Sequence, residues 1–277
     1  MLVSTPIGNL GDMTHRGIQA LQDADLILCE DTRLTARLLT HYAVATRTEP
    51  LHEHNEEGRI SAVLARLAGG ARVALVSDAG TPLVSDPGYR LVRAAIAAGY
   101  RVGAMPGANA ATTALVLSGL PPHPFLFLGF LSARQGARRA ALTRLRAVER
   151  AGLSATLVFY EAPHRLAEAL GDMAEIFGDR QAAVARELTK RFEEVRRAGL
   201  TELAGHYAAH AARGEITLVV GPAAAEAVGV AELDTLLHAA LREHSVREAA
   251  GAVAEATGLP RRQVYARALE LRAENPA

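Results

Sequence analysis

One stretch decides the fold, and it reads Leu75-Val76-Ser77-Asp78-Ala79-Gly80-Thr81-Pro82-Leu83-Val84-Ser85-Asp86-Pro87-Gly88. Its apolar start predicts a buried strand, and the glycines and prolines that follow predict a long turn before a helix. Such strand–turn–helix units are typical of α/β proteins with a mainly parallel sheet. Asp78, at the strand end, can accept hydrogen bonds from a ligand, whereas Asp86 before Pro87 fits a helix N-cap.

The same pattern recurs on both sides of this stretch. We expect strands at Leu2–Ser4, Leu26–Cys29, Arg72–Ser77 and Arg101–Ala104, and helices at Thr14–Gln22, Thr32–Tyr42, Glu56–Ala68 and Tyr89–Ala98. Turn-rich loops follow three of these strands. Ligands bind beyond the carboxyl ends of strands in open α/β sheets, so these loops predict one shared pocket.

A proline-dense break at residues 119–124 predicts a boundary between an N-terminal α/β domain, 1–119, and a second α/β domain, 120–223. Residues 231–275 read as a small C-terminal helical module, with two amphipathic helices around Gly258 that resemble a helix-turn-helix. Such a hairpin serves either packing or nucleic-acid contact. In the second domain we expect strands at Phe125–Gly129, Thr156–Tyr160, Ala182–Arg186 and Ile216–Val220; the module's expected helices are Leu233–Glu243, Ser245–Thr257 and Arg261–Arg272.

Composition restricts the class of protein. Apolar residues make up 49% of the 277 residues, enough for sizeable cores, yet no apolar run is long enough to span a membrane. Residues 1–10 carry no signal-peptide pattern. The first expected strand is short because the chain begins almost at the first loop, which favours a translation start upstream of Met1. Because Cys29 is the single cysteine, an internal disulfide is excluded. We therefore expect a cytoplasmic protein.

The net charge is zero, so a nucleic-acid partner would have to meet local basic patches. Lys190 is the only lysine, and a lysine, unlike an arginine, can lose its proton when desolvated. This favours a chemical role for Lys190, although chance survival of one lysine fits equally well. Two stretches are rich in basic residues, and each fits a solvated helix face as well as it fits a nucleic-acid patch. The stretches consist of Arg134, Arg138, Arg139, Arg144, Arg146 and Arg150, and of Arg186, Lys190, Arg191, Arg196 and Arg197.

Other short motifs each allow two interpretations. The residues from Glu30 to Arg33 either orient a substrate or form a capped helix start with a local ion pair. Asn109 either belongs to a ligand-binding loop or simply caps a helix. The segment from His52 to Glu56 offers ligand-like side chains, but no third ligand follows at a suitable spacing, so we expect no metal.

Taken together, the motifs resemble the tetrapyrrole methylase family, in its branch of ribosomal RNA (cytidine-2′-O-)-methyltransferases. The resemblance covers nearly the whole chain and rests on motifs in matching order: residues 5–10, 30–33, 52–56, 77–82 with 86–88, 160–161 with 164–165, and 186–190. One departure is in the third loop, where Ala108 replaces an expected proline.

The resemblance implies the two-domain tetrapyrrole-methylase fold, a homodimer, and S-adenosyl-L-methionine in the cleft between the α/β domains. The implied substrate is a cytidine ribose of small-subunit (16S) ribosomal RNA, either naked or in an assembled 30S subunit. Carried over by position, the cofactor-binding residues are Ile7, Ser77, Asp78, Thr81, Asn109, Ala110, Glu161 and Leu188.

Methylation of a ribose hydroxyl is helped by a base or a cation near the 2′-oxygen. Lys190 is the first candidate, and Asp31, Glu30 and His54 are the alternatives. We expect Arg33 and Arg165 to bind flanking phosphates. Two other functions fit parts of the sequence: methylation of a tetrapyrrole on the same fold, and DNA binding by a non-enzymatic regulator that uses the C-terminal helices.

Overall fold

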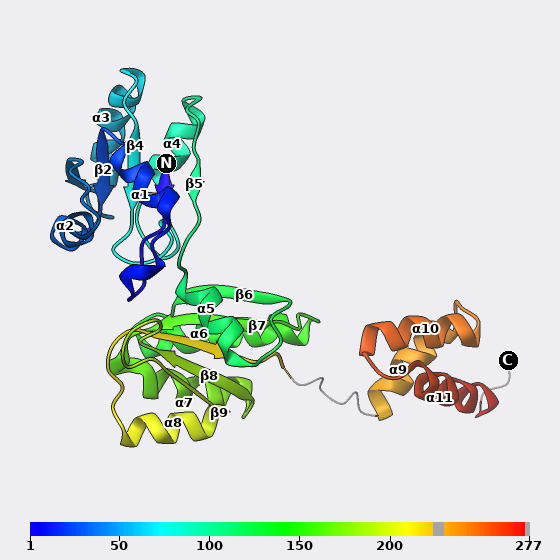
Figure 1. Cartoon of the computed structure of the whole chain (residues 1–277). Coiled ribbons are helices and arrows are strands. Elements are labelled where there is room, and N and C mark those ends of the chain that lie inside the picture. Colours follow the sequence, from blue (N-terminus) through cyan, green and yellow to red (C-terminus); the bar gives the residue numbers. More distant parts are fainter. Residues whose placement is uncertain (224–229, 275–277) are drawn as a thin grey trace. The chain divides into compact units, whose positions relative to one another are not determined.

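Parallel strands form the first of two sheets in the computed structural model, which describes residues 1–223 and 230–274 (Figure 1). The strand order is β3-β2-β4-β1-β5. The predicted parallel sheet is confirmed, while β3 was not predicted because its residues, Thr-Glu-Pro, show no apolar pattern. The strands are β1 (Leu2–Val3), β2 (Leu26–Cys29), β3 (Thr48–Pro50), β4 (Val73–Val76) and β5 (Ala104–Met105).

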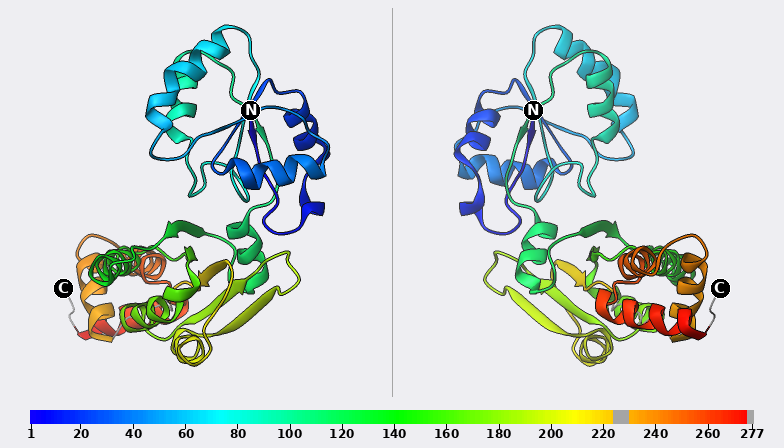
Figure 2. Two further views of the ribbon diagram at one scale, coloured as in Figure 1. Left: turned by 90° about the vertical axis from the view of Figure 1, so that its left-hand side faces the viewer. Right: turned by 90° about the vertical axis from the view of Figure 1, so that its right-hand side faces the viewer.

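Helices cover both faces of this sheet because its central strands are apolar on both sides. In β2, Ile27 and Cys29 pack with α1 and α2, whereas Leu26 and Leu28 pack with α3 and α4. Figure 2 shows the strands between these two pairs of helices. The helical segments are η1 (Leu10–Asp12), α1 (His15–Gln22), α2 (Thr32–His41), α3 (Glu56–Ala68) and α4 (Tyr89–Ala97).

The second sheet is mixed, with the order β6-β7-β10-β8-β9. Only the β6–β7 pair is parallel among its described pairs. The edge strand β9 was not predicted, since its residues, Glu-Val-Arg-Arg-Ala-Gly, form neither an apolar run nor an alternating pattern. The strands are β6 (Phe125–Phe130), β7 (Thr156–Glu161), β8 (Gln181–Arg186), β9 (Glu194–Gly199) and β10 (Ile216–Val220).

The helix α5 (Ala110–Ser118) covers one face of this second sheet, through Ala111, Ala114 and Leu115. It therefore packs with the second sheet, although it precedes the boundary expected at residue 119. Arg197 of β9 donates to the carbonyl of Ser118 at 3.1 Å and so caps the end of α5. The other face carries α6 (Gln135–Arg150), α7 (Leu166–Phe177) and α8 (Leu200–Ala209), and the short η2 (Pro163–Arg165) precedes α7.

The chain divides into two compact units, Met1–Pro222 and Ala223–Ala277. The second unit has its own apolar core, which includes Leu237, Val253 and Val264. Its three helices confirm the predicted helical module over the described residues; residue 275, at the end of the predicted range, lies outside them. The helices are α9 (Val230–Leu241), α10 (Val246–Thr257) and α11 (Arg261–Glu274).

Local sequence explains the ends of α10. Ser245 accepts from the backbone N–H of Glu248 while the Glu248 carboxylate accepts from the Ser245 N–H, which is a capping box. Gly258 ends the helix in the left-handed conformation, at φ +69°. None of the described helices is long and apolar enough to cross a membrane.

Candidate active site

The loops after β1 and β4 are clamped together by backbone hydrogen bonds. The N–H of Thr5 donates to the carbonyl of Gly80 at 2.9 Å, and the Gly80 N–H donates back to Thr5 at 3.0 Å. Gly80 has φ +85°, and a Cβ there would lie 3.3 Å from the Ile7 side chain. A glycine therefore lets the two loops approach closely and form one wall.

Thr81 connects this wall to the loop after β5. Its hydroxyl accepts from Ser4 Oγ at 3.3 Å and donates to the carbonyl of Ala108 at 3.2 Å. Asn109 caps α5 by accepting from the N–H of Thr112 at 3.2 Å, which matches the capping interpretation. The three strand-end loops are thus joined through one hydroxyl.

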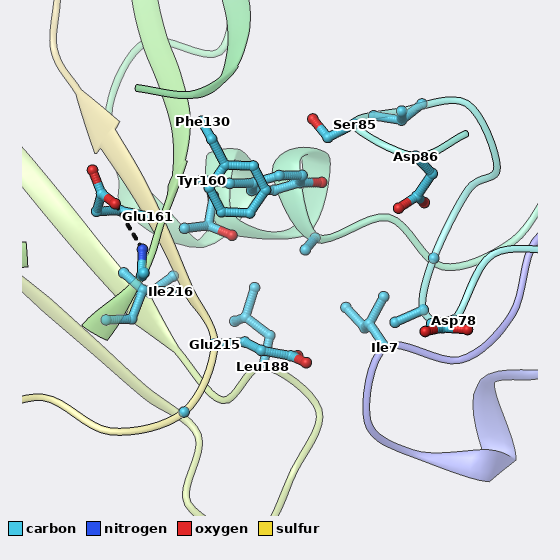
Figure 3. Close-up of a pocket in the computed structure, with 18 of the residues that line it drawn as sticks. Ile7, Asp78, Ser85, Asp86, Phe130, Tyr160, Glu161, Leu188, Glu215 and Ile216 are labelled. Atoms are coloured by element: carbon cyan, nitrogen blue, oxygen red, sulfur yellow. Dashed lines mark hydrogen bonds between the residues drawn. The ribbon is translucent and has the colours of Figure 1, made fainter. Parts of the chain in front are cut away.

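A cavity of about 330 Å³ lies between these loops and the second sheet (Figure 3). Its volume suits a small organic ligand. It is lined from the first sheet by the loops after β1 and β4, and from the second sheet by the ends of β6, β7 and β8 and the start of β10. Of the eight residues carried over as cofactor contacts, six line it: Ile7, Asp78, Thr81, Ala110, Glu161 and Leu188.

The other two of those eight support the loops from behind. Ser77 is 4% exposed, and its hydroxyl donates to the carbonyl of Gly80 at 3.1 Å. Asn109 donates from its amide to Thr81 Oγ1 at 3.4 Å in addition to capping α5. Neither side chain lines the cavity.

Asp86 lines the cavity and does not cap a helix, so the capping interpretation was wrong. Helix α4 begins at Tyr89, and its N-cap residue is Gly88, which has φ +118°. The turn through Pro87 and Gly88 places the N-cap two residues after Asp86, so that Asp86 itself lies outside the helix. Burial, followed by the negative charge of Glu30, raises the pKa of Asp86 to about 6.

The loop that carries Asp86 is strained. Leu83 and Ser85 both have positive φ, at +73° and +67°, which L side chains rarely adopt. Such strain persists only where the surroundings impose it, and it is common beside binding sites. Sequence reasoning singled out this loop for its glycines and prolines, but it did not identify Ser85 as a lining residue.

The lining combines carboxylates with apolar side chains. Phe130 and Tyr160, whose ring centroids are 5.5 Å apart, stand on the second-sheet side of the cavity (Figure 3). This combination suits a ligand with a flat apolar part and positively charged groups. Four carboxylates contribute to the lining: Asp78, Asp86, Glu161 and Glu215.

Glu161 is held in place by its own neighbours. Its Oε1 accepts from the Ala162 N–H and from Arg165 Nε, both at 2.8 Å (Figure 3 shows the Ala162 bond). The Arg165 side chain is 17% exposed and is engaged in this ion pair. The structure thus presents Arg165 as the partner of a lining carboxylate, where sequence reasoning expected a phosphate contact.

The loop after β2 lies beside the cavity. The Asp31 N–H donates to Asp78 Oδ1 at 3.0 Å, which joins this loop to the lining. Asp31 caps α2 and pairs with Arg33 at 2.8 Å, and these hydrogen bonds lower the pKa of Asp31 to about 2. By contrast, burial and the neighbouring charge of Asp78 raise the pKa of Glu30. Glu30 is therefore the stronger base of the two carboxylates.

The loop after β3 places its two histidines differently. His54 is exposed, whereas His52 is half-buried, and its Nδ1 is enclosed without a hydrogen-bond partner among the described residues. A positive charge on His52 would lower the pKa of Glu30, so the two side chains lie within electrostatic reach of each other. Sequence reasoning chose His54, since burial is not visible in the motif. Within residues 1–223 and 230–274, no group of three potential ligands could hold a metal ion.

Lys190 does not line the cavity, but it contacts a residue that does. Its Nζ lies 2.8 Å from Glu187 Oε1 and 3.1 Å from Glu215 Oε2. Partial burial alone would lower the pKa of Lys190, but the hydrogen bonds to both glutamates outweigh it and raise the pKa above its usual value. A lysine held in the charged form is a poor general base.

The two basic stretches are largely engaged in structural interactions. Arg138 is fully buried and pairs with Asp172 at 2.7 Å, and Arg139 pairs with the same carboxylate at 3.0 Å. Arg186 and Arg196 both pair with Glu194. These arginines tie helices and strands together, so at these positions the stretches form neither solvated helix faces nor a continuous nucleic-acid surface.

Comparison with known proteins gives a consistent result over both units. The model for Tetrapyrrole (Corrin/Porphyrin) Methylases matches residues 1–204, and the model for the RsmI C-terminal HTH domain matches residues 223–272. The chain is 50% identical to the Ribosomal RNA small subunit methyltransferase I of Mesorhizobium japonicum, over 98% of this chain and 91% of the relative. It is 44% identical to the protein of that name from Pseudomonas aeruginosa, over 97% and 96%.

Solved structures share the fold at lower identity. The methyltransferase CobJ has a TM-score of 0.59 at 24% identity and covers 82% of this chain and 95% of its own. A diphthine synthase has the same TM-score at 17% identity, over 79% and 88%. The chain therefore belongs to the tetrapyrrole methylase family and, within it, to the group of the ribosomal RNA small subunit methyltransferases I.

Proposed function

We propose that the protein is an S-adenosyl-L-methionine-dependent methyltransferase that modifies the 2′-oxygen of a cytidine in 16S ribosomal RNA. The observation that carries the proposal is the carboxylate-lined cavity at the strand ends of a tetrapyrrole-methylase fold. The names of the relatives at 43–50% identity support ribosomal RNA of the small subunit as the substrate.

The lining residues fit S-adenosyl-L-methionine. Its sulfonium and ammonium groups are positive, and the carboxylates of Asp78 and Asp86 are complementary to them. Phe130, Tyr160 and Leu188 offer the apolar surface that an adenine ring needs. When bound, the cofactor supplies an activated methyl group, and the protein supplies alignment and exclusion of water.

Glu30 is our candidate for the general base. A ribose hydroxyl is a weak nucleophile until its proton is removed. Glu30 follows β2 directly, beside Asp31, whose N–H binds the lining residue Asp78, and its raised pKa makes it a better proton acceptor near neutral pH. Lys190 is charged and paired, and Asp31 is a weaker base, so both are less suited to this role.

Helix α2 supports an RNA substrate. Its N-cap Asp31 is hydrogen-bonded to the lining residue Asp78. The exposed Arg33, Arg37 and His41 follow one another at four-residue intervals, on one face of the helix. The helix contains no acidic residue, and no described carboxylate pairs with Arg37. Phosphates that flank the target nucleotide would meet positive charge along this face.

Transfer of labelled methyl groups tests the proposal. Purified protein is incubated with methyl-labelled S-adenosyl-L-methionine and either small subunits that lack the modification or the naked RNA, and the RNA is then digested. Label on a cytidine ribose is the expected result, and the two substrates show which form is used. If the protein binds the cofactor but labels neither substrate, and labels a tetrapyrrole instead, the proposal is wrong.

We also propose a cytoplasmic homodimer, following the family resemblance. The edge strand β6 offers exposed Phe125, which does not line the cavity and is 44% accessible in the single chain. Light scattering after gel filtration tests this: a mass near twice 29.3 kDa is expected, and a mass of 29.3 kDa contradicts the dimer.

A further inference from the structure

Lys190 joins three segments that surround the cavity. Its ammonium bridges the carboxylates of Glu187, in the loop after β8, and Glu215, just before β10. Its aliphatic stem passes over Gly8, in the loop after β1. A Cβ at Gly8 would lie 2.9 Å from Lys190 Cε and 3.0 Å from the carbonyl oxygen of Leu188, and closer still to Lys190 Cγ.

The turn of Glu187, Leu188 and Thr189, called the corner below, is bonded to Glu215 in a way that favours this contact. Glu187 Oε1 also accepts from the Glu215 N–H at 3.0 Å, and the Glu187 N–H donates to the Glu215 carbonyl at 3.0 Å. The Glu187 side chain fills the space that a Cβ at Gly214 would need. Glu187 and Thr189 both have positive φ, at +51° and +64°. Such a conformation persists only when surrounding contacts impose it.

The ammonium supplies the charge that this corner requires. Glu187 and Glu215 would repel each other without a cation between them, since both bind the same Nζ. Leu188 is the middle residue of the corner, between Glu187 and Thr189. Its side chain is 6% exposed and packs in the same apolar cluster as Ile7. Figure 3 shows Leu188 and Glu215 on the same side of the cavity, with Ile7 beside them.

We propose that Lys190 is a positioning residue that holds the loop after β8 and the segment before β10 against the loop after β1. It thereby fixes Leu188 and Glu215 in the wall of the cofactor cavity. The inference rests on the proposed function in one respect, namely that the ligand of the cavity is S-adenosyl-L-methionine. It assigns Lys190 to binding of the methyl donor, and the chemical step is left to other groups.

Two substitutions separate this role from that of a base. Arginine keeps the charge and can pair with both glutamates but cannot lose its proton, whereas methionine keeps the stem and removes the charge. We expect Lys190→Met to weaken donor binding about tenfold, measured by calorimetry with S-adenosyl-L-methionine and with S-adenosylhomocysteine. At saturating donor, kcat should stay within about threefold of the wild type, and Lys190→Arg should be close to wild type in both quantities.

A base role would give the opposite pattern. Lys190→Met and Lys190→Arg would both lose turnover while the donor affinity stayed unchanged, and that result would overturn the proposal. A matched control is Arg186→Met, which removes the 2.8 Å pair with Glu194 next to this loop at a similar exposure, 23% against 27%, without touching the cavity. Donor affinity should not change in this control.

Gly8→Ala is a second variant, and it tests the same contact without changing any charge. Its methyl group would displace the Lys190 stem, so we expect a similar loss of donor affinity in a chain that melts as a folded protein. If Gly8→Ala and Lys190→Met both bind the donor as tightly as the wild type, Lys190 is not a positioning residue. If the wild type itself fails to bind the donor, the proposed function fails first, so the two failures are distinguishable.

Discussion

At the scale of single residues, burial changes the chemistry of the carboxylates around the cavity. Asp86 is half-buried and lies near the charges of Glu30 and Asp78, and its pKa is raised to about 6. Asp31 is close by in sequence to Glu30, yet hydrogen bonds from Arg33 lower its pKa to about 2. Neighbouring carboxylates are thereby prepared for different roles.

We expect Asp86 to make donor binding depend on pH. A folded-state pKa above the unfolded value means that ionisation of Asp86 costs stability as the pH rises from about 4 through 6. A cationic donor favours the ionised form, so affinity should rise several-fold between about pH 5 and 7. In Asp86→Asn this rise should be much smaller. Calorimetry across this range checks the prediction, and equal pH profiles in both proteins would contradict it.

Glu30→Gln tests the candidate base. Removing a general base costs about a hundredfold or more in turnover, while the donor affinity should stay within about twofold of the wild type. Single-turnover transfer of labelled methyl groups, combined with calorimetry, measures both quantities. Asp31→Asn is the control, and we expect a much smaller loss because the Asp31 carboxylate caps a helix and is a weak base. A larger loss in Asp31→Asn than in Glu30→Gln would refute the assignment.

At the scale of elements, an ion-pair network joins α6 to α7. Arg138 has no exposed side-chain surface, and its partner Asp172 is only 4% exposed. Arg139 shares Asp172 and also pairs with Glu175. The network explains why these arginines are not available as a nucleic-acid surface, although they follow one another in the sequence.

Removing the buried member of this network should be costly. Arg138→Ala leaves the carboxylate of Asp172 buried with fewer partners, which should cost about 3 kcal/mol of unfolding free energy. Arg144→Ala, on an exposed position of the same helix, should change stability by less than about 0.5 kcal/mol. Urea denaturation of the two variants makes the comparison, and equal stabilities would show that Arg138 is not a structural residue.

The exposed basic face of α2 belongs to the same scale. Arg37→Met removes one positive charge that we assign to a phosphate contact, so the KM for RNA should rise several-fold. The slope of log kcat/KM against log salt should become shallower by about one. Arg93→Met, on an exposed position of α4 on the other face of the sheet, is the control. If the slope is the same in both variants, RNA does not follow α2.

At the scale of the whole molecule, the chain consists of units with separate cores. Every lining residue of the cavity belongs to residues 1–222, and the helices of the second unit pack around their own apolar cluster. The relatives match over both units, and the helix-turn-helix domain model covers residues 223–272. Donor binding and any contribution of the helical unit are therefore separable.

Truncation after residue 222 should separate donor binding from the contribution of the helical unit. The shortened chain should bind S-adenosyl-L-methionine within about twofold of the full chain, since it keeps the whole cavity lining. Its kcat/KM on the RNA substrate should fall if the helical unit contributes to substrate binding. Calorimetry and methyl transfer on the two chains measure this, and loss of donor binding in a folded truncated chain would contradict the separation.

Much of the fold could be predicted because its signals are local. The apolar runs of β2 and β10 predicted the same strand bounds that the structure has, and the caps and turn around Gly258 predicted α10 and α11 to within a few residues. The cavity lies beside loops that the sequence had singled out, since turn-rich loops at strand ends converge in an open α/β sheet. The motifs in matching order identified the family.

By itself, the sequence determined the class of fold, the family and the strand-end loops by which the first sheet lines the cavity, since periodicity, turns and motifs are properties of short segments. Only the tertiary structure decided which polar side chains are buried and with which partners they pair. Lys190 meets Glu215, 25 residues away, and Arg138 meets Asp172, 34 residues away. Burial and charge pairing across such distances depend on packing, and they determine whether a carboxylate, a lysine or an arginine acts in chemistry or in support.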